Sequence, residues 1–95
     1  MQEILSLLYQ IRKSPKIFLG KPSLDLLKAF VDGCICYINE RDHVFVDFLP
    51  GFQEFIQKKY KVVGDYSWKT IIQNETSSEE EAFYKFFDLL DEFFE

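Results

Sequence analysis

The chain has 95 residues, the length of one domain, and its 47% hydrophobic content with eleven phenylalanines can supply a core. Its charged fraction of 28% is ordinary for a globular protein, so disorder over the body of the chain is not expected. The net charge of −5 has one source: residues 1–74 carry ten Lys and Arg against eight acids, whereas residues 75–95 carry one Lys against eight acids. Phosphate groups would be repelled by that segment, which argues against nucleic acid as its ligand and favours a basic partner.

The sequence indicates neither a membrane span nor export. No stretch approaches the roughly 18–20 apolar residues that a membrane helix needs, and the first residues lack the pattern of a secretory signal. Cys34 and Cys36 are separated by one residue, which is too close for an ordinary structural disulfide. We therefore expect a cytoplasmic protein with reduced thiols.

Two helices are predicted in the first part of the chain. Apolar residues at helical spacing predict a helix over residues 3–12, which ends before Pro15. A short connection containing Gly20 follows. Ser23 is suited to cap a second helix, whose apolar spacing continues to Ile38.

The end of this second helix has two interpretations. Gly33 lies inside the apolar pattern and costs a helix about 1 kcal/mol relative to Ala. The β-rich runs CICYI and HVFVDF flank the polar residues NERD, which fits a hairpin over residues 34–48. A continued helix gives an all-α domain, and the hairpin gives an α+β domain.

Three more helices are expected after Pro50, within residues 50–60, 67–74 and 77–94. Ser77 is the expected N-cap of the last one, with Glu80 three residues later completing a capping box. This last helix is expected to pack against the second and third. The favoured fold is thus an all-α, single compact domain over residues 1–95 with about five helices.

The last helix has two distinct faces. Its apolar residues are expected to lie in the core: Ala82, Phe83, Phe86, Phe87, Leu89, Leu90, Phe93 and Phe94. Acids dominate the other face, and those near the C-terminal end oppose the helix dipole. Such a face indicates either solubility or electrostatic steering toward a basic partner. The candidate partner-binding residues are Glu81, Tyr84, Asp88, Asp91, Glu92 and Glu95.

No catalytic, metal or cofactor site is predicted. His43 and the two cysteines lack a fourth ligand, and on a helix Cys34 and Cys36 would point apart, although on a strand they would share a face. The lysines around Tyr60 are typical of a helix C-terminus rather than of a nucleic-acid site. We expect a protein without enzyme activity.

The order of four segments resembles a known group of proteins. The segments are KIFLGKPSLDLLKAFVDG, FLPGFQEFIQKKY, SWKTII and EEEAFYKFFDLLDEF, and together they cover most of residues 16–94. They resemble small bacterial immunity proteins of contact-dependent growth inhibition and polymorphic toxin systems. Those relatives more often carry Gly-Tyr where this chain has Gly33-Cys34, and the HVFV stretch has no counterpart.

The resemblance implies an inhibitor that binds one cognate toxin, commonly a nuclease, and it assigns no functional residue. A nuclease is expected to have a basic active site, so an acidic helix face would suit it. The alternative is a non-catalytic adaptor or regulatory protein that binds another basic partner.

Overall fold

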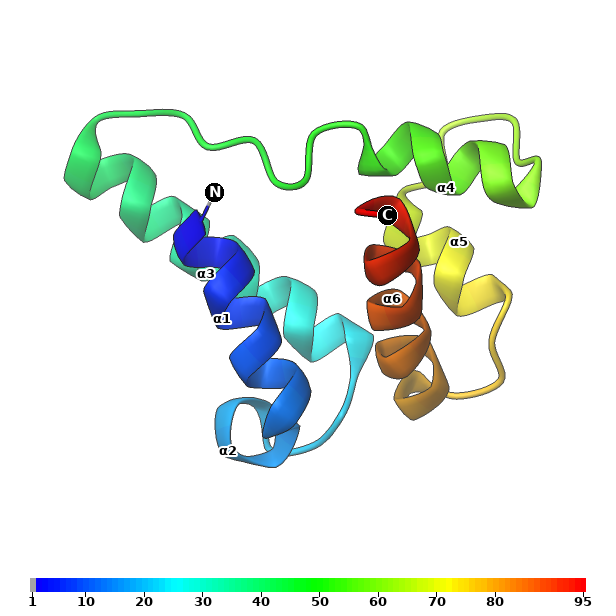
Figure 1. The fold of residues 1–95 in the computed structure, drawn as a ribbon, viewed down its shortest axis with the longest axis horizontal. Helices are drawn as coiled ribbons and strands as arrows, with labels where there is room; N and C mark the ends of the chain where they lie inside the picture. The colour runs from blue at the N-terminus through cyan, green and yellow to red at the C-terminus, as the bar shows by residue number, and fades with distance from the viewer. Residues whose placement is uncertain (1) are drawn as a thin grey trace.

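A computed structural model describes residues 2–95, which form six α-helices joined by loops (Figure 1). The helices are α1 (Gln2–Lys13), α2 (Pro15–Leu19), α3 (Leu24–Asp42), α4 (Phe52–Tyr60), α5 (Trp68–Asn74) and α6 (Glu79–Phe93). No strand occurs among these residues. The all-α class predicted from the sequence is confirmed, with one helix more than expected.

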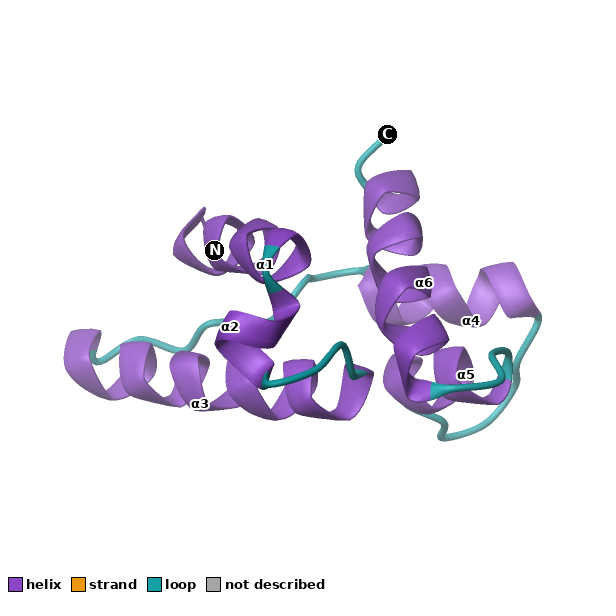
Figure 2. Ribbon diagram, turned by 90° about the horizontal axis from the view of Figure 1, so that it is seen from below, coloured by secondary structure: helices purple, strands orange, loops and turns teal. Residues whose placement is uncertain are grey.

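The helices lie in two groups. In Figure 1, α1 and α3 lie on the left with α2 below them, and α4, α5 and α6 lie on the right. Figure 2 shows α6 running across the N-terminal end of α3. A stretched loop, residues 43–51, joins the two groups along the top of Figure 1.

The hairpin considered for residues 34–48 is wrong, because α3 continues unbroken through Gly33 to Asp42. Ser23 caps its start as predicted, with its hydroxyl accepting the N–H of Leu26 at 3.3 Å. Ile38 is buried in the core, so the second half of α3 gains packing that a solvent-exposed hairpin would lack. This burial outweighs the helix propensity that Gly33 loses.

The unexpected helix is α2, in the connection after α1. Ser14 ends α1 as predicted, and Pro15 then takes the first helical position, where its missing N–H is harmless. Gly20 ends α2 with φ of 85°, a conformation that side chains with a Cβ rarely adopt. Five residues are too few for an apolar period to be recognised.

The buried face of α6 forms the centre of the core. It packs against α3 and α5, and Phe52 of α4 contacts Phe86 and Phe93 with ring centroids 5.7 and 5.4 Å apart. The predicted core positions of α6 are buried, except that Phe93 is half-buried and Phe94 is 51% exposed. Phe94 is exposed because α6 ends at Phe93 and no element covers the last turn.

A polar junction joins the N-terminal ends of α3 and α6. One oxygen of Glu79 accepts the hydroxyl of buried Ser23 at 3.3 Å and the N–H of Asp25 at 3.0 Å. Its other oxygen accepts the amide of Gln73 at 3.0 Å. Asp25 in turn accepts Lys69 Nζ at 2.6 Å, and this hydrogen bond lowers the pKa of Asp25. The junction adds polar contacts at the starts of α3 and α6 to the apolar packing that buries one face of α6.

Candidate functional site

The candidate site is the exposed face of α6, and Glu81, its first candidate residue, already has a structural role. Ser78, not Ser77, is the N-cap, and its hydroxyl accepts the N–H of Glu81 at 3.1 Å. The carboxylate of Glu81 accepts the N–H of Ser77 at 2.9 Å and also the Ser77 hydroxyl. These hydrogen bonds lower the pKa of Glu81. The predicted pairing of Ser77 with Glu80 is therefore wrong by one residue, because the helix begins one residue later.

Two more of the candidate residues form ion pairs with other helices. Arg12 of α1 donates to both carboxylate oxygens of Asp91, at 3.1 and 2.9 Å, and its guanidinium lies 5.4 Å from the ring centre of Phe87. Lys59 of α4 donates to Glu92 at 2.7 Å, and this hydrogen bond raises the pKa of Lys59. These cations offset the unfavourable position of two acids at a helix C-terminus.

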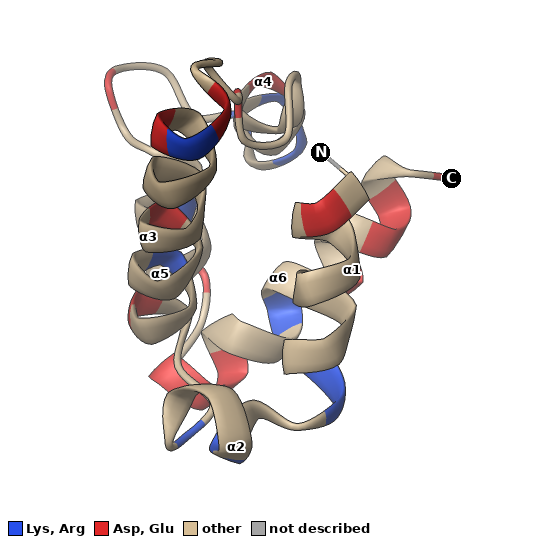
Figure 3. Cartoon of the chain, turned by 90° about the vertical axis from the view of Figure 1, so that its left-hand side faces the viewer, with Lys and Arg blue, Asp and Glu red and all other residues tan. Residues whose placement is uncertain are grey.

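Tyr84, Asp88 and Glu95 are exposed, and no hydrogen bond or ion pair joins their side chains to the rest of residues 2–95. Asp88 lies on α6, and Glu95 follows just beyond the last turn of the helix, which ends at Phe93. Glu81 lies seven residues before Asp88, two turns earlier on the same face of α6. We call Glu81, Asp88 and Glu95 the acidic ridge. Acidic positions gather on the last turns of α6 beside the C-terminus in Figure 3.

The surface changes sign beside Tyr84. Its side chain borders a shallow depression of about 470 Å³ between α6 and the segment that links α1 to α2. Lys13 and Lys16 line the same depression, together with Glu80. The acidic character predicted for the face thus holds for its C-terminal half, and cations flank its N-terminal half.

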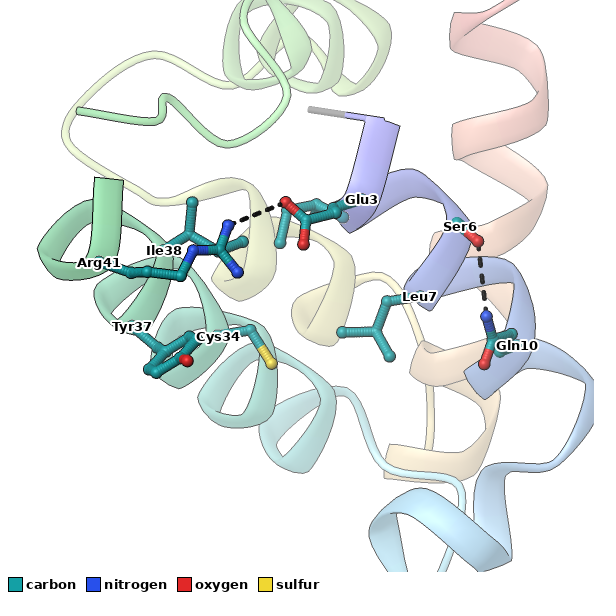
Figure 4. Close-up of a pocket in the computed structure, with 9 residues that line it drawn as sticks. Glu3, Ser6, Leu7, Gln10, Cys34, Tyr37, Ile38 and Arg41 are labelled. Atoms are coloured by element: carbon teal, nitrogen blue, oxygen red, sulfur yellow. Dashed lines mark hydrogen bonds and ion pairs between the residues drawn. The ribbon is translucent and has the colours of Figure 1, made fainter. Parts of the chain in front are cut away.

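A more apolar hollow of about 410 Å³ lies between α1 and α3 (Figure 4). Leu7, Cys34 and Ile38 form its walls. The polar side chains at its edge are engaged with one another: Arg41 lies 3.4 Å from Glu3, and Gln10 lies 3.4 Å from Ser6. The hollow was not predicted, because its shape depends on how α1 lies against the end of α3.

The cysteines and the histidine lie apart from any cluster of ligands. Cys34 is half-buried on α3 and Cys36 is exposed, as expected for neighbours on a helix. His43 is the C-cap of α3, with φ of 54°. Within residues 2–95, no group of three or more His, Cys, Asp and Glu side chains has a geometry that could hold a metal ion.

None of the helices formed by residues 2–95 combines the length and the apolar character that crossing a bilayer requires. No family model matches the chain, and the searches of curated proteins and of solved structures gave no match.

Proposed function

We propose that the protein is a non-catalytic inhibitor that acts in the cytoplasm and binds a basic protein through the acidic ridge of α6. A toxic nuclease is the proposed target class. One contrast carries this proposal: Asp91 and Glu92 each have a cation from another helix, whereas Asp88 and Glu95 have none within residues 2–95. The chain thus supplies cations where acids hold helices together and leaves Asp88 and Glu95 of the ridge without an ion pair within residues 2–95.

Uncompensated charge on a helix favours fast association with a partner of opposite sign. Electrostatic steering raises association rates and falls as salt is added. Glu81 and Asp88 are about 10 Å apart along the axis of α6, since each residue of a helix rises about 1.5 Å, and Glu95 lies just beyond the last turn. A nuclease binds a polyanion, so its cleft presents cations that this row of carboxylates can occupy. Phe94, exposed beside Glu95, adds an apolar contact.

The test uses the product of the reading frame immediately upstream of this one, because immunity and toxin genes are neighbours in the systems that the sequence resembles. The purified upstream product is assayed for cleavage of DNA and of RNA, with increasing amounts of this protein. We expect activity to fall to zero at a fixed stoichiometry. An upstream product that binds but keeps its activity would identify an adaptor instead, and one that does not bind would overturn the proposal.

A further inference from the structure

Residues 44–48, VFVDF, form a segment that belongs to neither helix group, and we call it the extended segment. It crosses between α3 and α4 along the top of Figure 1. Left-handed residues bound it at both ends: His43 has φ of 54° and Leu49 has φ of 50°. Leu49 is buried, so its unusual conformation is held by packing. The course of the segment is therefore fixed at both ends.

From Phe45 to Phe48, the side chains of the extended segment alternate in exposure as they do along a β-strand, whereas Val44 at its start is exposed. Val46 and Phe48 pack against the core, whereas Phe45 is 87% exposed and Asp47 is exposed. Successive side chains of an extended chain point to opposite faces. The outer face thus presents one aromatic and one acidic residue, and Asp47 has no ion pair within residues 2–95.

The backbone of the extended segment makes hydrogen bonds on one edge only. The N–H of Val46 donates to the side-chain oxygen of Asn39 at 2.8 Å, and the N–H of Val44 donates to the carbonyl of Asn39 at 3.2 Å. The N–H and C=O groups of Phe45 and Asp47 make no hydrogen bond within residues 2–95. In an extended chain, alternate residues direct these groups to opposite edges. One edge of the segment is therefore free to pair.

We propose that the extended segment adds as a strand to the exposed edge of a β-sheet in a protein partner. The partner strand carries apolar and basic side chains in alternation, opposite Phe45 and Asp47. The β-favouring composition fits this role, and the exposed Asp47, which has no ion pair within residues 2–95, favours a basic side chain opposite it. Pairing with a second copy of the chain is disfavoured, because two strands of five residues make only a marginal ribbon.

The probe is a disulfide-cyclised β-hairpin peptide whose outer strand alternates valine and lysine. It is titrated into the ¹⁵N-labelled full chain while amide exchange is followed by NMR. We expect slower exchange at the amides of Phe45 and Asp47, with those of Val44 and Val46 unchanged. The Asp88→Lys, Glu95→Lys double variant should behave identically, which separates this proposal from the function proposed for the acidic ridge.

Two variants test the backbone and the charge separately. Phe45→Pro removes a free N–H but keeps both hydrogen bonds to Asn39, and it should weaken peptide binding at least tenfold. Phe45→Ala, the matched control, keeps that N–H and should weaken binding less. If Phe45→Pro does not fold, the Asp47→Lys variant provides the test. It should no longer bind the valine–lysine peptide, and it should bind a peptide that alternates valine and glutamate.

Three results would overturn the proposal. One is the absence of protection at Phe45 and Asp47 at millimolar peptide. Another is unchanged peptide affinity in folded Phe45→Pro or in Asp47→Lys. The third is protection that grows with protein concentration in the absence of peptide, because a second copy would then occupy the edge.

Discussion

Asp91 and Glu92 are adjacent in the sequence, yet their carboxylates bind cations on different helices, Arg12 of α1 and Lys59 of α4. Consecutive residues of a helix point about 100° apart, so the two side chains leave α6 toward opposite neighbours. The last turns of α6 are thereby held from both sides. Asp88 lies on the helix line between these two pairs, where neither cation reaches it.

The Arg12–Asp91 pair should make a small, salt-sensitive contribution to stability. Both side chains remain partly exposed, and exposed pairs are worth about 0.2–1 kcal/mol. A double-mutant cycle with Arg12→Ala and Asp91→Ala, measured by urea denaturation, should give a coupling energy in that range that shrinks in 1 M salt. A cycle between Arg12 and Glu54, which do not pair, should give no coupling. Equal coupling in both cycles would contradict the assignment.

Core substitutions on α6 should be far more damaging than substitutions at its end. Phe86 and Leu90 are fully buried, so replacing either with Ala leaves a cavity and should lower the free energy of unfolding by about 2–5 kcal/mol. Phe94→Ala removes an aromatic ring of the same type from a largely exposed site and should cost less than about 1 kcal/mol. Urea denaturation of the three variants provides the comparison. Similar losses for Phe94 and Phe86 would show that the chain end is packed.

How far the sequence predicts this molecule depends on whether the deciding interaction is local. The cap at Ser23 and the apolar stripe of α6 are local patterns, and both were predicted correctly apart from Phe94, which is exposed. The ion pair of Asp91 was not, because Arg12 lies 79 positions away and no local pattern specifies it. Without that pairing, all five acids of the face appeared equally available. In the structure, Asp88 and Glu95 remain available to a partner, because they have no ion pair within residues 2–95.

Gly33 is the opposite case, because the low helix propensity of glycine is a local signal that packing outweighs. It lies inside α3, is exposed, and has no atom within 4 Å of the position that a Cβ would take. Gly33→Ala should therefore raise the free energy of unfolding by about 0.5–1 kcal/mol. Gly20→Ala, with equal space but φ of 85°, should be destabilising because of backbone strain. Thermal denaturation of both variants checks this, and a destabilised Gly33→Ala would refute an unbroken α3.

Stability should fall as the pH is lowered below about 5. The pKa of Asp25 is lowered by its hydrogen bond to Lys69, and that of Glu81 by its bonds to Ser77. The unfolded chain then binds more protons than the folded chain as the pH falls through the unfolded pKa values, about 3.8 and 4.5, so the free energy of unfolding decreases. Urea denaturation between pH 6 and 3 should show this decrease. Asp25→Asn should flatten it, whereas Asp65→Asn, at an exposed loop position without an ion pair within residues 2–95, should not.

Reversing the charge of the ridge should change association without changing the fold. The pair of choice is Asp88→Lys with Glu95→Lys, because reversing Glu92 would place a second cation against Lys59 and disturb α6. Both sites are exposed and without an ion pair within residues 2–95, so the free energy of unfolding should shift by less than about 1 kcal/mol in total. Association with the basic partner should slow at low salt, and its dependence on salt should flatten, because steering acts on the association rate.

The matched control for this reversal is Glu54→Lys with Asp65→Lys, which changes the net charge equally at exposed acids away from α6. If net charge alone steers the partner, both double variants slow association equally. If the ridge is the contact surface, only the α6 variant also speeds dissociation, since its carboxylates are then lost from the bound complex. Stopped-flow association and dissociation rates measured at two salt concentrations separate these outcomes. Unchanged rates for the α6 variant would leave its acids as a solubilising face and remove the basis for the inhibitor proposal.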